Sequence, residues 1–182
     1  MGWLSEFIST FVSFFPHLLK VRATHGAVKF VHGKKVVELK PGLHWYWPLV
    51  TEVLEIPTAR TTYNFDTQVI LTRDAKPLAV SAVLVYRVVD VVAALSQSYD
   101  VDDTVGDVGN SSITRVLSGK TLDEVLESQR EGNLQDELTE MCSEELSEFG
   151  IEVEAAALTD FSTCMVIKTL GNAPAIVPVA AE

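Results

Sequence analysis

Histidine and cysteine are the residues of this sequence best suited to bind a metal or to act as a nucleophile. The four histidines are His17, His25, His32 and His44, and the two cysteines are Cys142 and Cys164. The histidines lack the spacing of metal ligands, and two cysteines are too few for a zinc site or a disulfide framework. The sequence also contains no Gly-x-Ser-x-Gly, no glycine-rich phosphate loop and no Cys–His–Asn signature. It therefore predicts no enzyme, no metal and no cofactor.

The polar candidates that remain have simpler structural interpretations. Cys142 lies on the apolar stripe of a predicted helix, so we expect a buried small hydrophobic residue. His44 follows a Pro-Gly turn, where we expect an orienting hydrogen bond. Acidic residues opposite the apolar stripe predict a solvated face, or a surface that pairs with Lys34, Lys35 or Arg130 of a neighbouring subunit. These acidic residues are Glu137, Glu140, Glu144, Glu145 and Glu148.

Length and composition limit the architecture and the partners. The chain has 182 residues, of which 47% are hydrophobic, so it can form one packed domain with a small appendage. Its formal net charge is -11, and such an acidic chain would repel a phosphate backbone. We therefore expect no nucleic acid partner. The low cysteine content fits a reducing compartment.

Residues 2–20 form a distinct apolar segment with the spacing of an amphipathic helix. Its large apolar side chains recur every three or four residues. They are Trp3, Leu4, Phe7, Ile8, Phe11, Val12, Phe14, Phe15, Leu18 and Leu19. The opposite stripe is small and polar, with Glu6 as its one formal charge, and Pro16 should bend or end the helix.

Four interpretations of this segment compete. A secretory signal needs a positive start and a small-residue cleavage site, and the segment has neither. A membrane span needs about 20 apolar residues, and the stretch from Trp3 to Leu19 is shorter than that. N-myristoylation needs Ser or Thr where Glu6 stands. We therefore expect a helix that lies in the membrane interface, or dips in and returns at Pro16, with the ten apolar side chains in contact with lipid. The alternative is a helix that packs on its own domain.

The side of the membrane depends on two basic residues. Lys20 and Arg22 follow the apolar segment, and only the amino terminus precedes it as a positive charge. Because basic residues are retained on the cytoplasmic side, we expect the domain on the cytoplasmic face.

Short strands with turn signals are predicted from Val21 to Asn64. Strands at 27–31 and 34–39 flank a turn at His32-Gly33, and strands at 43–48 and 50–56 follow. A further strand is expected at 68–72.

Residues 78–89 give the longest predicted strand. One face is apolar throughout and the other is mostly apolar, so we expect a central strand that is covered on both sides. Arg87 is the exception, and we expect it near an edge or paired with an acid.

Helical spacing then dominates up to Gly150. Asp90 is expected to cap a short helix, Asp102 or Asp103 a second, and Thr121 a third through a capping box. Gly132-Asn133 should interrupt the helical pattern, and residues 151–161 alternate as a last strand. Strands, then helices, then a strand predict an α+β fold with helices on one side of a mostly antiparallel sheet.

Three stretches, taken in order, resemble the SPFH (band 7) domain of the stomatin, prohibitin and flotillin family. The first is LKPGLHWYWPLVTEVLEIPTARTTYNF, with a Pro-Gly-hydrophobic-His turn and an apolar-Pro run. The second is QVILTRDAKPLAVSAVLVYRVVDVVAAL, with a Thr-x-Asp loop and a strand that ends in Tyr-Arg-Val. The third runs from Ser111 to Phe161 and includes Gly-Lys, Thr-Leu-Asp-Glu and Phe-Gly-Ile. The resemblance predicts a membrane helix at 1–20, an SPFH domain at 21–161 and a short tail at 162–182.

The sequence departs from the family pattern in two places. Family members usually continue into a long charged coiled coil, whereas the tail here has no heptads and contains Gly171, Pro174 and Pro178. The tail could be frayed, or could dock on a neighbour as an added strand through 165–167 or 176–177. The stretch VDDTVGDVGNSS has few aliphatic residues, so we expect a short or mobile helix there.

The resemblance implies a non-enzymatic scaffold on a membrane. Family members form rings or cages that enclose a lipid patch, so the expected partners are membrane lipid and further copies of the chain. One alternative is a regulator that binds and restrains a membrane protease or channel. Another is a soluble structural oligomer whose N-terminal helix is buried between subunits.

Overall fold

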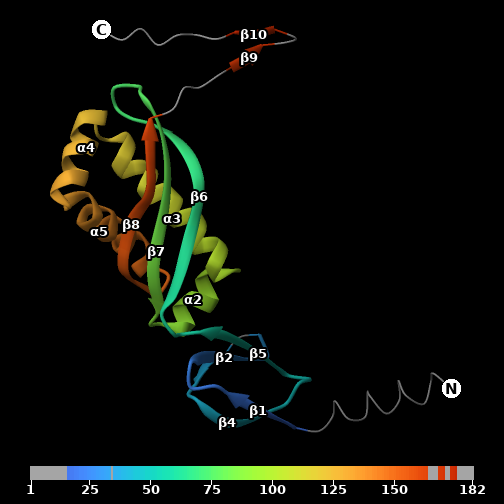
Figure 1. The fold of residues 1–182 in the computed structure, drawn as a ribbon. Helices are drawn as coiled ribbons and strands as arrows, with labels where there is room; N and C mark the ends of the chain where they lie inside the picture. The colour runs from blue at the N-terminus through green and yellow to red at the C-terminus, as the bar shows by residue number, and fades with distance from the viewer. Residues whose placement is uncertain (1–15, 34, 164–167, 171–172, 176–182) are drawn as a thin grey trace.

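The computed structural model describes residues 16–33, 35–163, 168–170 and 173–175. Figure 1 shows an elongated molecule, with small sheets at one end and a larger sheet with its helices beyond them. Every strand pair in these residues is antiparallel. The α+β arrangement expected from the sequence, with antiparallel strands, is confirmed.

Two small sheets form the first part of the molecule. One pairs β1 (His17–Val21) with β4 (Gly42–Tyr46). The other has the order β3 (Lys35–Leu39), β2 (His25–Val31), β5 (Thr51–Pro57). His32 and Gly33 both have positive φ, of 53° and 64°, so the predicted tight turn follows β2. Val21, Ala27 and Leu39 form a small core between the two sheets, with Leu19 and Val53 against it.

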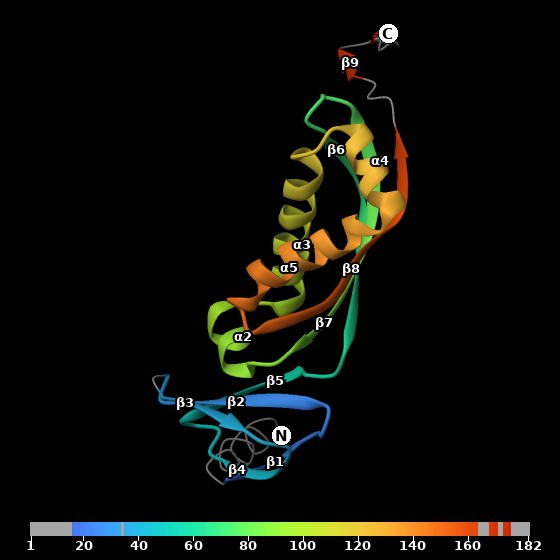
Figure 2. The ribbon, with the colours of Figure 1, turned by 90° about the vertical axis from the view of Figure 1, so that its left-hand side faces the viewer.

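The larger sheet has the order β6 (Thr61–Leu71), β7 (Pro77–Val88), β8 (Ile151–Thr163). The helices that follow β7 are α2 (Val91–Gln97), α3 (Val101–Ser118), α4 (Leu122–Glu131) and α5 (Asn133–Ser147). Figures 1 and 2 show α3, α4 and α5 on one face of this sheet. Strand β6 begins earlier than the predicted strand at 68–72. The sequence pattern did not show its first half, because a bulge between Phe65 and Gln68 interrupts the alternation.

The main core lies between β7 and the helices. The predicted core face of β7 is confirmed, since every second residue from Leu78 to Val88 is buried. The opposite face was expected to be covered as well, and here the prediction is wrong. Ala79, Val83 and Val85 are only half-buried, because the helices cover a single face of the sheet. Arg87 on that face is paired with an acid, as expected, through a 2.8 Å contact with Glu152.

Helix α3 is a full helix of 18 residues, so the expectation of a short or mobile segment is wrong. Two glycines of this helix let β6 approach it closely. A Cβ at Gly106 would lie 2.5 Å from the Tyr63 hydroxyl oxygen, and one at Gly109 would lie 2.5 Å from Phe65 Cζ. Gly106 and Gly109 are both buried, which shows that packing against β6 outweighs their low helix propensity.

The helix caps follow the sequence with one exception. Asp90 caps α2, and Thr121 forms the predicted capping box with Glu124. Gly132 takes a φ of 82° at the junction between α4 and α5. Asp100, rather than Asp102 or Asp103, caps α3 by accepting backbone N–H bonds from both of those residues.

The two ends of the chain differ from the prediction where they are described. His17 to Val21 were expected mostly in the N-terminal helix, but they form β1 and pair with β4 over five residues. Pro16 precedes this strand and cannot continue a helical hydrogen-bond ladder. In the tail, β9 (Lys168–Leu170) pairs with β10 (Ala173–Ala175). The two tail segments predicted to dock on a neighbour, 165–167 and 176–177, lie outside the described residues.

Candidate membrane-facing surface

Strands β1 and β4 present an apolar outer face at one end of the molecule. Leu18 lies opposite Trp45, and Lys20 lies opposite Leu43, so these four side chains share a face. Trp45 is 67% exposed, Leu43 63% and Leu18 54%. The alternate residues Leu19 and Val21 point to the small core. We call Leu18, Lys20, Leu43, Trp45 and Trp47 the tip surface.

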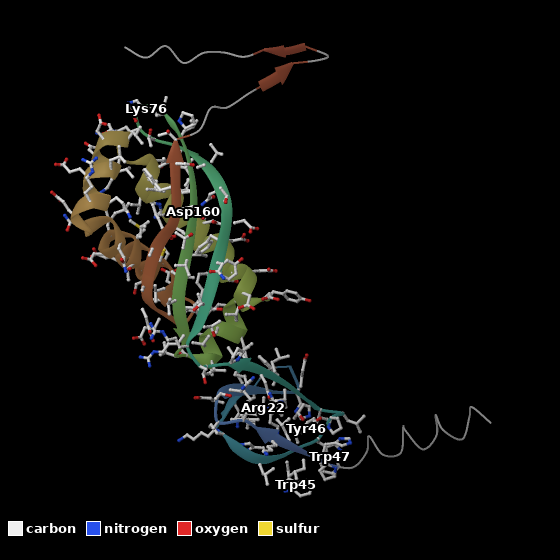
Figure 3. The ribbon with its side chains drawn as sticks, in the orientation of Figure 1. Arg22, Trp45, Tyr46, Trp47, Lys76 and Asp160 are labelled. Atoms are coloured by element: carbon white, nitrogen blue, oxygen red, sulfur yellow. The ribbon has the colours of Figure 1, made fainter. Side chains whose placement is uncertain are left out.

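The tip surface continues into the connection between β4 and β5. Trp47, Leu49 and Val50 are all exposed there. Figure 3 shows Trp45, Tyr46 and Trp47 together, beside the point where the described chain begins. Large apolar side chains gathered in water mark an interaction surface. Tryptophan is also the residue that collects at the boundary between lipid and water.

The small core explains why the strands expose these side chains. A strand places successive residues on opposite faces, so the inward residues Leu19 and Val21 fix the outward position of Leu18 and Lys20. His44 holds the preceding turn, because its Nε2 donates to the Lys40 carbonyl oxygen at 2.6 Å. This bond is the orienting hydrogen bond expected for His44, and it requires the proton on Nε2.

The sequence pattern of one known family extends over both parts of this fold. The sequence model of the SPFH domain / Band 7 family matches residues 19–169. This range is most of the chain and includes all three strands of the larger sheet. The chain belongs to the SPFH domain / Band 7 family. The resemblance seen in the sequence is therefore confirmed.

Several SPFH relatives have stomatin names. The chain is 28% identical to Stomatin-1 of Caenorhabditis elegans over 161 residues, which is 88% of this chain and 48% of that protein. It is 27% identical to a stomatin homolog of Pyrococcus horikoshii over 140 residues, which is 77% of this chain and 52% of that protein. It is also 27% identical to Stomatin-like protein 3 of Mus musculus over 139 residues. The chain thus spans about half the length of these relatives.

Most of the predicted membrane-binding residues lie outside the described part of this SPFH chain. Trp3, Leu4, Phe7, Ile8, Phe11, Val12, Phe14 and Phe15 all belong to residues 1–15. Leu18 and Leu19 are described, and they lie in a strand rather than in the predicted helix. Leu18 faces outward, whereas Leu19 packs against the small core, so only Leu18 contributes to the exposed surface. Among the described residues, no helix is long and apolar enough to cross a membrane.

Sequence reasoning missed Leu43, Trp45 and Trp47 as surface residues. The stretch Leu43 to Pro48 was predicted as a strand, but its role in the surface was not recognised. The available signal was the run His-Trp-Tyr-Trp, which places two tryptophans on the same face of a strand. A period of two puts one face of any strand outward, and here the outward face of β4 carries Trp45, whereas Trp47 follows the strand in the connection to β5.

The other candidate residues have structural roles in the described part of the chain. Cys142 is fully buried, and burial raises the pKa of its thiol to about 11. No group of histidine, cysteine and acidic side chains in residues 16–33 and 35–163 has the arrangement of a metal site. Two glutamates of the acidic run pair within the same chain, Glu137 with Lys120 and Glu145 with Arg115. Cys164 lies outside the described residues.

Proposed function

We propose that this chain is a non-enzymatic, membrane-anchored scaffold of the SPFH type. Its apolar N-terminal segment and its tip surface enter the cytoplasmic leaflet together, and its copies assemble side by side into a ring or cage that organises a lipid patch. The observation that carries the proposal is the exposure of Leu18, Leu43, Trp45 and Trp47 next to the start of the described chain. The family membership and the stomatin names of several relatives support it.

The energetics favour insertion of this end of the molecule. Complete burial of one large apolar side chain contributes about 1.5–3 kcal/mol. The four apolar residues of the tip surface and the apolar segment before them supply several such contributions. Their summed free energy of insertion exceeds that of a single weak membrane anchor. Anchored copies also meet at a high effective concentration, so weak lateral contacts are sufficient for assembly.

Flotation with phospholipid vesicles tests the proposal. The wild-type chain should float with the vesicles, and Phe11→Asp with Phe15→Asp should leave it at the bottom of the gradient. Trp45→Ser with Trp47→Ser should reduce the floated fraction severalfold, because two indole rings are lost from the interface. The matched control is Tyr99→Ser, since Tyr99 is a fully exposed aromatic residue outside the tip surface.

The result also decides between the proposal and its alternatives. Flotation that is unchanged in both double variants contradicts membrane anchoring by these residues. A stable and defined oligomer in detergent-free buffer that ignores vesicles identifies the soluble structural oligomer instead. Cross-linking on membranes distinguishes the scaffold from the regulator of a membrane protease or channel. Cross-links only between copies of this chain support the scaffold, and cross-links to one stoichiometric membrane protein identify the regulator.

A further inference from the structure

Positive and negative charges are segregated along this molecule. Residues 16–57, which form the two small sheets, contain six basic and three acidic residues, a net charge of +3. Residues 58–163, which form the larger sheet and its helices, contain seven basic and 20 acidic residues, a net charge of -13. All four histidines also lie in the first part. The end of the molecule that exposes tryptophan is therefore the cationic end.

The cations of the acidic part are mostly neutralised by neighbouring carboxylates. Six of its seven basic residues make ion pairs in the described part of the chain. The pairs are Arg60–Glu154, Arg73–Glu124, Lys76–Asp74, Arg87–Glu152, Arg115–Glu145 and Lys120–Glu137. By contrast, no basic side chain of residues 16–33 and 35–57 pairs with a described acid. The described basic side chains of the first part are thus available for an external anion.

One of these lysines lies in a hollow of the tip. Lys29, Trp45, Tyr46 and Trp47 line an open hollow of about 300 Å³, together with Pro16. Lys29 is half-buried on the face of β2 that also carries Ala27 of the small core. Lys20 is exposed on the outer face of β1, directly opposite Leu43. Lys20 and Lys29 therefore both lie in the small sheets at this end of the molecule, Lys20 opposite Leu43 and Lys29 beside the aromatic side chains of the hollow.

We propose that the tip binds the headgroups of anionic phospholipids, with Lys29 in the hollow and Lys20 on the outer face of β1 as the groups that contact phosphate. The proposal rests on the membrane function proposed above and adds the class of lipid. Indole rings settle at the boundary between acyl chains and headgroups, which brings neighbouring ammonium groups to the depth of the phosphates. An anionic surface attracts the cationic end and repels the acidic part. The same charges therefore hold the elongated molecule end-on to the bilayer.

Vesicle binding by the full chain tests this lipid preference. Vesicles of phosphatidylcholine alone are compared with vesicles that also contain about 30% phosphatidylglycerol, at low and at raised salt. The wild-type chain should bind the anionic vesicles more tightly, and raised salt should reduce this difference. Lys20→Gln with Lys29→Gln should weaken binding to anionic vesicles by about fivefold per lysine, and so remove most of the preference for anionic over neutral vesicles.

The matched control removes two cations from the acidic part of the molecule. Lys76→Gln with Arg130→Gln changes the net charge equally, and Lys76 lies at the end opposite the tip (Figure 3). This control should keep the full preference for anionic vesicles. Circular dichroism and the thermal midpoint verify that each variant is folded. Lys20→Gln alone provides a milder test, because Lys20 is exposed and does not line the hollow.

Each outcome bears on a different proposal. Equal binding of the wild-type chain to both kinds of vesicle overturns the lipid preference and leaves membrane anchoring standing. Failure to bind either vesicle overturns both proposals. A preference that survives loss of Lys20 and Lys29, or that the control also loses, overturns the assigned site. Displacement by inorganic phosphate beyond that caused by chloride at equal ionic strength identifies a free-anion site and overturns the lipid assignment.

Discussion

Asp74 connects the loop between β6 and β7 to the start of helix α4. Its Oδ1 accepts a hydrogen bond from the Thr72 hydroxyl at 2.6 Å and one from the Leu122 backbone N–H at 3.1 Å. Its other carboxylate oxygen lies 3.0 Å from the Lys76 ammonium group. These contacts, with the hydrogen bond from Thr72 as the largest cause, lower the pKa of Asp74 from 3.8 to about 2.

The lowered pKa predicts how the stability contribution of Asp74 depends on pH. A carboxylate whose pKa is lower in the folded state stabilises the fold above its unfolded pKa, and this stabilisation is lost as the pH falls. Asp74→Asn keeps a hydrogen-bond acceptor but removes the charge, so it should destabilise the protein at pH 7. The difference from the wild type should shrink between about pH 4 and about pH 2.

Urea unfolding at a series of pH values measures this difference. Asp107→Asn, on the exposed side of α3, is the control for the loss of one surface carboxylate. If the difference in free energy of unfolding between the wild type and Asp74→Asn stays constant down to about pH 2, the stabilising role of the charge is contradicted.

At the residue scale, sequence predicts a role best where the signal is local. Thr121 and Glu124 form their capping box within four residues, and the prediction is confirmed. The sequence prediction named Asp102 or Asp103 as the cap of α3, and it is wrong. The structure selects Asp100, because its extended backbone allows its side chain to accept from both following N–H groups. Trp45 was missed because its exposure depends on a strand pair that is distant in sequence.

Helix α3 and strand β6 depend on close contact at two glycines. Gly109→Ala would place a Cβ 2.5 Å from Cζ and 2.9 Å from Cε1 of Phe65, whose side chain is buried. Overpacking of this kind costs about 1–3 kcal/mol, whereas replacing a glycine in a helix by alanine contributes up to about 1 kcal/mol. We expect Gly109→Ala to lower the free energy of unfolding by about 1–2 kcal/mol.

Chemical denaturation of three variants measures this cost. Ser111→Ala, at an exposed position of the same helix, should change the free energy of unfolding by less than about 0.5 kcal/mol. Phe65→Leu with Gly109→Ala should lose less stability than the sum of the single changes, because the shorter side chain makes room. If Gly109→Ala stabilises the protein, the close packing of α3 on β6 is refuted.

At the element scale, the order and type of most elements were predictable. The apolar alternation of β7 continues along the whole strand, and the helical spacing of α5 continues for several turns. Both elements were therefore predicted correctly. The bulge at Asp66 and Thr67 shifts the alternation of β6 and hides its first half. Leu18 and Leu19 continue the helical spacing of the segment before them, yet tertiary pairing with β4 makes them a strand. Local spacing alone does not show which partner a segment will find.

At the scale of the whole molecule, charge and shape act in the same direction. The end that exposes Leu18, Leu43 and Trp45 has a net positive charge, and the elongated part beyond it is strongly acidic. A bilayer with anionic lipids would attract the first and repel the second, so the molecule should stand on its tip. The overall charge of -11 conceals this arrangement, because the asymmetry appears only when the fold divides the chain.

Depth-dependent quenching of tryptophan fluorescence tests the position of the tip most directly. Trp3→Phe with Trp47→Phe leaves Trp45 as the one tryptophan of the chain. On vesicles that contain brominated phospholipid, its fluorescence should be strongly quenched and shifted to shorter wavelength. The control replaces all three tryptophans by phenylalanine and adds Tyr99→Trp, and its fluorescence should remain unquenched. Quenching at position 99 with none at Trp45, while the protein is bound to the vesicles, would contradict insertion of the tip.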